Sequence, residues 1–145
     1  MRQKATEFLQ NTTLALFGLS DRKGSVSLQI YMLLVKNNFE IYGINPNRKE
    51  VEGIRCYSSL AELPEKVQGA IIVTNPAISK EVIQQCLENN VRNLWFQYET
   101  MNDEIRQWCT EKEVNWIQSC ILLHSNDVGF PHNVHQFFYK IFVRN

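Results

Sequence analysis

Short segments rich in apolar residues alternate along this chain with segments in which apolar residues recur at helical spacing. Residues 14–17 form a continuous apolar run, which is typical of a strand buried on both faces. Residues 39–44, 69–73, 91–96 and 114–117 indicate four further strands. Helical spacing is found over residues 28–34, 78–89 and 102–112. Because strands and helices alternate at every step, the sequence predicts an α/β fold with right-handed crossovers. We expect a doubly wound, five-stranded parallel sheet with helices on both faces.

Two further helices are expected at the ends of the chain, a leading helix within residues 1–12 and a last helix over residues 131–142. Pro131 suits the first position of that last helix. The 145 residues are close to the prior of about 150 residues for one domain, and no low-complexity linker interrupts them. The sequence therefore predicts a single domain over residues 1–145.

The composition excludes several classes of partner. Fifteen Lys and Arg residues balance fifteen Asp and Glu residues, so the chain lacks the positive field that nucleic acids or anionic membranes attract. No apolar run approaches the roughly 18 residues of a membrane-spanning helix, and the N-terminal MRQKATEFLQ lacks the apolar core of a secretory signal. The four cysteines form no C-x-x-C pair, which argues against a zinc ribbon or a thioredoxin-like motif. We expect a soluble, cytoplasmic protein.

Polar segments that suit a ligand follow three of the expected strands. They are Gly18-Leu19-Ser20, Asn45-Pro46 and Thr74-Asn75-Pro76. Ligands of open parallel sheets lie outside the carboxyl ends of the strands, and the free amides of a helix that starts near Ser25 can face an anion. Arg22 and Lys23 add positive charge beside them. These features predict a diphosphate site, although each segment alone is also an ordinary turn or strand end.

The pattern disfavours a nicotinamide dinucleotide and gives no catalytic motif. The loop after the first strand contains only Gly18 and Gly24, so the G-x-G-x-x-G fingerprint is absent. The second strand ends in Asn45, where an acid should hold the ribose, and Glu40 lies at the wrong end. Neither a P-loop nor a G-x-S-x-G elbow is present. We therefore predict no catalytic residues.

Three segments together resemble the small CoA-binding-domain family. They are residues 14–20 (LALFGLS), 39–46 (FEIYGINP) and 53–60 (GIRCYSSL). Trp95-Phe96-Gln97 and Cys120 also match, and the resemblance extends from about Phe8 to His135. The family is similar to the N-terminal domain of the succinyl-CoA synthetase alpha subunit. The resemblance implies a Rossmann-like domain that binds coenzyme A or an acyl-CoA and has no established reaction of its own.

The resemblance also implies a role for each segment of the predicted site. Gly18 and Ser20 would approach the diphosphate, with Arg22 and Lys23 on phosphate and Ser25 to Ser27 beginning the helix beneath it. Asn45 and Pro46 would border the adenosine, Arg48 or Lys49 would meet the 3′-phosphate, and Thr74, Asn75 and Pro76 would line the pantetheine arm.

The chain departs from the family at two places, and these keep other functions open. Val26-Ser27-Leu28 replaces the usual small residues at the helix start, and Tyr98-Glu99-Thr100 stands where a glycine is usual. Tyr98 and Glu99 would narrow the site or repel phosphate. The alternatives are an NAD(P)-binding oxidoreductase or regulator, a CoA-dependent transferase that lacks its partner subunit, and an interaction module without a ligand.

Three remaining features have two interpretations each. His132 and His135 share the spacing of one helix face, but no further ligands complete a metal set, so we expect packing roles and no metal. Cys120 would either meet a CoA thiol as a mixed disulfide or be a small buried residue. The aromatic residues of the last helix favour a homodimer where they exceed what the core can bury.

Overall fold

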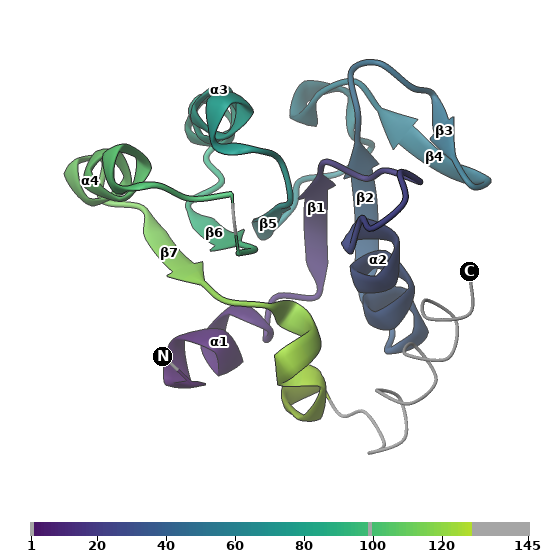
Figure 1. The fold of residues 1–145 in the computed structure, drawn as a ribbon, viewed down its shortest axis with the longest axis horizontal. Coiled ribbons are helices and arrows are strands. Elements are labelled where there is room, and N and C mark those ends of the chain that lie inside the picture. The colour runs from purple at the N-terminus through teal and green to yellow at the C-terminus, as the bar shows by residue number, and fades with distance from the viewer. Residues whose placement is uncertain (1, 99, 129–145) are drawn as a thin grey trace.

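A seven-stranded sheet forms the centre of the structure, a computed structural model that describes residues 2–98 and 100–128 (Figure 1). In spatial order the strands are β3-β4-β2-β1-β5-β6-β7. Their bounds are β1 Thr13–Phe17, β2 Glu40–Ile44, β3 Glu50–Val51, β4 Ile54–Tyr57, β5 Gly69–Ile72, β6 Asn93–Phe96 and β7 Asn115–Gln118. Neighbouring strands are parallel, except that β3 and β4 are antiparallel.

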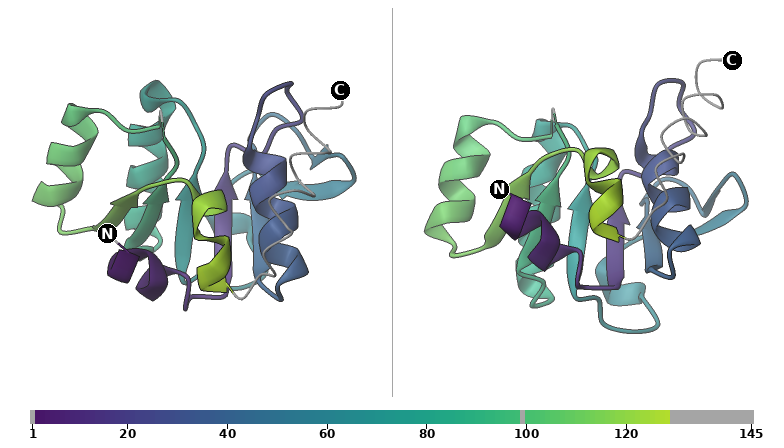
Figure 2. Two further views of the ribbon diagram at one scale, coloured as in Figure 1. Left: turned by 60° about the horizontal axis from the view of Figure 1, so that its bottom comes forward. Right: turned by 90° about the horizontal axis from the view of Figure 1, so that it is seen from below.

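Helices cover both faces of this sheet, and two apolar cores separate them from it. The helices are α1 Arg2–Phe8, α2 Ser27–Lys36, α3 Pro76–Glu88 and α4 Asp103–Glu111, with the 3-10 segments η1 Leu60–Glu62 and η2 Ile121–Val128. In Figures 1 and 2, α3 and α4 lie on the opposite side of the sheet from α1 and η2. Successive residues of β1 alternate between the cores: Leu14 and Leu16 face α1, α2 and η2, whereas Ala15 and Phe17 face α3 and α4. The predicted doubly wound α/β fold is confirmed.

The prediction of five strands was wrong, because β3 and β4 lie in a segment that was interpreted as a loop. Glu52 and Gly53 have φ angles of 49° and 78°, and two positive φ angles in a two-residue turn are typical of a tight hairpin. This turn pairs Glu50 with Arg55 and Val51 with Ile54. The hairpin has no continuous apolar run, so the strand signal used elsewhere in the chain is missing there.

The order of the strands creates a switch point between β1 and β5. From β1 the chain goes to β2 on one side of the sheet, and it later returns to β5 on the other side of β1. The loops after β1 and β5 therefore lead to helices on opposite faces. At such a point parallel sheets leave a crevice outside the carboxyl ends of their strands, which is where the candidate site lies.

The helix predicted over residues 131–142, with His132, His135 and the aromatic residues of the expected dimer surface, lies outside the described residues. Within the described ranges, no helix has the length and apolar character that crossing a membrane requires.

Candidate functional site

The end of β1 approaches the end of β5 so closely that only glycine fits there. Gly18 has a φ of +95°, and a Cβ atom on it would lie 2.9 Å from both the carbonyl carbon and the carbonyl oxygen of Val73. The backbone amide of Val73 in turn donates to the carbonyl of Phe17. The predicted Gly18 turn therefore lies directly beside the residues that lead to Thr74.

Serine hydroxyls fold the loop between β1 and α2 into a fixed turn. Ser27 is fully buried, and its Oγ accepts from the amide of Ser20 at 2.9 Å and lies 2.8 Å from Oγ of Ser25. Ser20 Oγ accepts from the amide of Arg22 at 3.0 Å. These bonds order the loop without a ligand, and they explain Ser27 at the position where the chain departs from the family.

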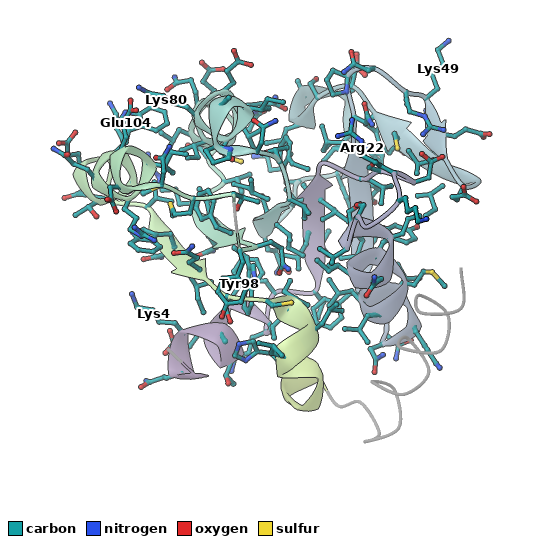
Figure 3. The ribbon with its side chains drawn as sticks, viewed as in Figure 1. Lys4, Arg22, Lys49, Lys80, Tyr98 and Glu104 are labelled. Atoms are coloured by element: carbon teal, nitrogen blue, oxygen red, sulfur yellow. The ribbon has the colours of Figure 1, made fainter. Side chains whose placement is uncertain are left out.

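The helix that follows this loop has an apolar residue at its N-cap position. Val26 occupies this position of α2 and makes no side-chain cap hydrogen bond, although Ser25 Oγ accepts from the amide of Ser27, the first residue of the helix, at 3.2 Å. Both Val26 and Leu28 pack against the first core. A helix N-terminus whose N-cap residue supplies no acceptor presents amide groups and a partial positive charge that suit an anion. Arg22 and Lys23 are exposed in the adjoining loop, and Figure 3 shows Arg22 at the same end of the sheet as Lys49.

The loop after β2 is attached to the loop after β1 by two side-chain contacts. Asn45 Nδ2 donates to the carbonyl of Leu19 at 3.2 Å, and Arg48 Nη1 donates to Asp21 Oδ1 at 2.7 Å. The Arg48 guanidinium lowers the pKa of the Asp21 carboxyl below its ordinary value. Asn45 Oδ1 also accepts from the amide of Asn47 at 2.9 Å, which fixes the turn that contains the exposed Pro46.

The third predicted segment begins α3. Asn75 Oδ1 accepts from the amide of Ile78 at 3.2 Å and caps the helix, and Pro76 occupies its first turn. Thr74 Oγ1 lies 3.0 Å from Oγ of the buried Ser79. Thr74, Asn75 and Pro76 therefore have a structural role in starting α3, and the structure brings them to the same edge as Gly18.

A buried glutamine connects the ends of β6 and β7. Gln97 Oε1 accepts from Trp95 Nε1 at 3.1 Å and from the amide of Ile121 at 2.8 Å, while its Nε2 lies 3.4 Å from the sulfur of Cys120. Cys120 is half-buried and Tyr98 is 52% exposed. No pattern in the sequence marks Gln97 as the residue that joins these segments.

Arg55 and Tyr57 are also close to the site and were missed from the sequence. The Arg55 guanidinium carbon lies 4.7 Å from the centre of the Tyr57 ring, and the carbonyl of Tyr57 accepts from the amide of Asn45 at 2.9 Å. Their spacing of two residues places both side chains on one face of β4. That signal exists in the sequence only once β4 is identified as a strand.

The described residues provide little for catalysis. Ser119 Oγ lies 2.9 Å from His124 Nε2, but Ser119 is only 3% exposed, so the contact attaches η2 to β7. Burial raises the pKa of Cys86 to about 12 and that of Cys109 to about 11, which suppresses the thiolate. Within residues 2–98 and 100–128, no three His, Cys, Asp or Glu side chains are grouped as a metal site would need.

Two surface hollows are lined by none of the residues selected for this site. One, of about 180 Å³, lies beside α1 and includes Lys4 and Asn93, whereas the other, of about 700 Å³, lies beside η1, α3 and α4 and includes Lys80 and Trp108. Among the described residues, each hollow is lined by a single lysine, and Lys80 is paired with Glu104 at 2.9 Å (Figure 3). The carboxyl edge, with its several cations and the N-terminus of α2, is the stronger candidate for an anionic ligand.

Comparison with known proteins finds a matching family profile and several relatives. Residues 12–126 match the sequence profile of a family described as the CoA binding domain. An ADP-forming acetate–CoA ligase of Methanocaldococcus jannaschii is 31% identical over 80 residues, which are 55% of this chain and 11% of the ligase. The chain thus spans about a tenth of the length of that relative.

Two relatives of similar size extend the match. The uncharacterized protein YneT of Bacillus subtilis is 31% identical over 111 residues, covering 73% of this chain and 79% of YneT. The solved structure of a conserved hypothetical protein from Pyrococcus furiosus is 31% identical with a TM-score of 0.69, covering 77% of this chain and 97% of that one. The Rossmann-like fold that the resemblance implied is therefore confirmed, and the chain belongs to the CoA binding domain family.

Proposed function

We propose that this chain binds coenzyme A or an acyl-CoA at the carboxyl edge of its sheet and has no reaction of its own. The observation that supports this most directly is the turn from Gly18 to Ser27, which is ordered by its own serines and leads into a helix whose N-cap residue, Val26, supplies no acceptor. A turn that is ordered in advance loses less conformational freedom when a ligand binds. Coenzyme A offers this turn a diphosphate.

The proposed contacts follow the order of the groups in coenzyme A. The diphosphate meets the backbone at Gly18, Ser20 and Ser25 and the side chains of Arg22 and Lys23. Asn45 and Pro46 border the adenosine, and Arg48 or Lys49 meets the 3′-phosphate. The pantetheine arm passes Thr74, Asn75 and Pro76 towards the ends of β6 and β7.

Titration calorimetry tests this proposal with five ligands: CoA, 3′-dephospho-CoA, acetyl-CoA, NAD and NADP. We expect CoA and acetyl-CoA to bind, and 3′-dephospho-CoA to bind more weakly because it lacks the group assigned to Arg48 or Lys49. Binding of NAD in preference to CoA would support the oxidoreductase alternative. Absence of heat with all five ligands, from protein shown to be folded by circular dichroism, would favour the interaction module.

Charge reversal at Lys23 tests the phosphate contact itself. A charge-assisted hydrogen bond contributes about 1.5–3 kcal/mol, so Lys23→Glu should weaken CoA binding by about tenfold or more while leaving the Tm of the free protein nearly unchanged. Lys66→Glu is the matched control, because Lys66 is also exposed but precedes β5 at the opposite edge of the sheet. Equal affinities of the two variants would remove Lys23 from the site.

A further inference from the structure

An exposed ion pair joins two parts of the proposed site that would each meet the ligand. Asp21 belongs to the loop after β1, and Arg48 belongs to the loop after β2. Their side chains are 35% and 44% exposed, and Arg48 Nη1 lies 2.7 Å from Asp21 Oδ1. One of the cations assigned to the ligand is therefore already bound to a carboxylate.

This ion pair is not needed to hold the two loops together. Asn45 already connects the second loop to the carbonyl of Leu19, and the amide of Gly18 donates to the carbonyl of Ile44, at the end of β2, at 3.5 Å. Exposed ion pairs also contribute little to stability, because water and salt screen them. The carboxylate of Asp21 has its strongest electrostatic consequence at the site, since it lies beside Arg22 and Lys23 where an anion would bind.

We propose that Asp21 competes with the 3′-phosphate for Arg48 and so tunes the affinity and selectivity of the site. The inference rests on the proposed function, because it requires CoA to bind at this edge. In the free protein the Arg48 guanidinium pairs with Asp21. When CoA binds, Arg48 exchanges the carboxylate for the doubly charged phosphate, and Asp21 turns into solvent.

Removing the competing charge should therefore strengthen CoA binding. From the strength of exposed ion pairs, we expect Asp21→Asn to bind CoA about two- to fivefold more tightly at low ionic strength. The gain in affinity should be smaller with 3′-dephospho-CoA. The dissociation constant for 3′-dephospho-CoA divided by that for CoA should therefore be larger in the variant than in the wild type. The gain in CoA affinity should also decrease as salt is added, because salt weakens the ion pair in the wild type.

A control variant must distinguish the exchange of Asp21 for the 3′-phosphate at Arg48 from a general change in the charge near the site. Glu52→Gln removes one negative charge whose field also acts on Arg48, but Glu52 forms no ion pair with Arg48 among the described residues. We expect Glu52→Gln to change both affinities slightly and to leave their ratio unchanged. In an Arg48→Ala background, Asp21→Asn should no longer alter the ratio.

The outcomes distinguish this inference from the proposed function. If the wild type binds CoA but Asp21→Asn leaves the ratio unchanged or weakens binding, Asp21 does not compete and the inference is wrong, while the proposed function stands. If neither the wild type nor Asp21→Asn binds CoA, the proposed function is overturned and the inference with it.

Discussion

At the scale of single residues, Gly18 is the position that the fold constrains most directly. Its φ of +95° alone disfavours other residues, and the backbone of Val73 also leaves no space for a Cβ atom. Gly53 separates these two effects, since its φ is +78° but no atom lies within 4 Å of a Cβ built there. The pair therefore distinguishes the cost of a left-handed conformation from that of a steric clash.

We expect Gly18→Ala to lower the free energy of unfolding by more than Gly53→Ala does. A left-handed alanine costs about 1–2 kcal/mol, which is the loss expected for Gly53→Ala. Gly18→Ala should lose roughly 1–3 kcal/mol in addition, because Val73 must shift to relieve the overlap. Urea denaturation of both variants measures the difference. Equal losses of unfolding free energy would show that the backbone at Val73 shifts without a measurable loss of stability.

The sequence predicted which residues meet at the carboxyl edge of the sheet better than it predicted their bonds. Gly18, Asn45 and Thr74 were selected because each follows a predicted strand, and the parallel sheet brings such positions to one edge. The contacts of Ser27 and Gln97 depend on which atoms meet across loops, for example the amide of Ser20 with Oγ of Ser27. Single-residue patterns contain no signal for such contacts.

At the scale of elements, the helices that follow β5 and β6, which are α3 and α4, both begin with an asparagine N-cap. Asn75 caps α3 by accepting from the amide of Ile78, and Asn102 caps α4 by accepting from the amide of Ile105 at 2.9 Å. Asn75 lies at the proposed site, whereas Asn102 is not among the residues assigned to the ligand. This difference provides a matched pair of variants.

Both Asn75→Ala and Asn102→Ala should destabilise the protein by about 1 kcal/mol, the usual loss for an N-cap. Only Asn75→Ala should also weaken CoA binding, because its side chain lines the proposed path of the pantetheine arm. Thermal unfolding gives the first quantity and calorimetry at a temperature where both variants are folded gives the second. If the two variants lose CoA affinity equally, the loss at Asn75 reflects the cap alone.

Strands were predictable where the sequence contains a segment rich in apolar residues. They were not predictable where the pairing of two strands depends on the turn between them. Residues 69–73 were predicted as a strand from their unbroken apolar run, and every residue of β5 is indeed buried. The hairpin of β3 and β4 forms because Glu52 and Gly53 both adopt positive φ angles, and glutamate rarely does so. The pairing of β4 with β2, which brings Tyr57 to the site, could not be derived from the sequence for the same reason.

At the scale of the whole molecule, one hydrogen-bonded cluster connects β2 to the segment that leads into β5. The hydroxyl of Tyr42 lies 2.6 Å from an oxygen of Glu40 and 2.6 Å from an oxygen of Glu65, and it donates its one proton to either. These two hydrogen bonds raise the pKa of Tyr42 above its ordinary value, and the hydrogen bond from Tyr42 is the first cause that lowers the pKa of Glu65. The cluster therefore makes the stability of the fold depend on pH in both alkaline and acidic solution.

The direction of each effect follows from the state that holds the proton more tightly. Tyr42 keeps its proton more tightly in the folded chain, so its contribution to stability is complete below about pH 10, the ordinary tyrosine pKa, and is lost as the pH rises towards the folded-state pKa. Glu65 releases its proton more readily in the folded chain, so its contribution is present above its ordinary pKa and is lost as the pH falls through the lowered one.

Tyr42→Phe should consequently flatten the pH dependence of stability. We expect the wild type to lose more unfolding free energy than the variant between pH 9 and pH 11, roughly the range around the ordinary tyrosine pKa, and the variant to be less sensitive to acid as well. Urea denaturation at a series of pH values measures both slopes. Tyr98→Phe is the control, since it removes a phenol that is 52% exposed and should leave both slopes as in the wild type. Parallel curves for the wild type and Tyr42→Phe would show that the two carboxylates do not hold the Tyr42 proton in solution.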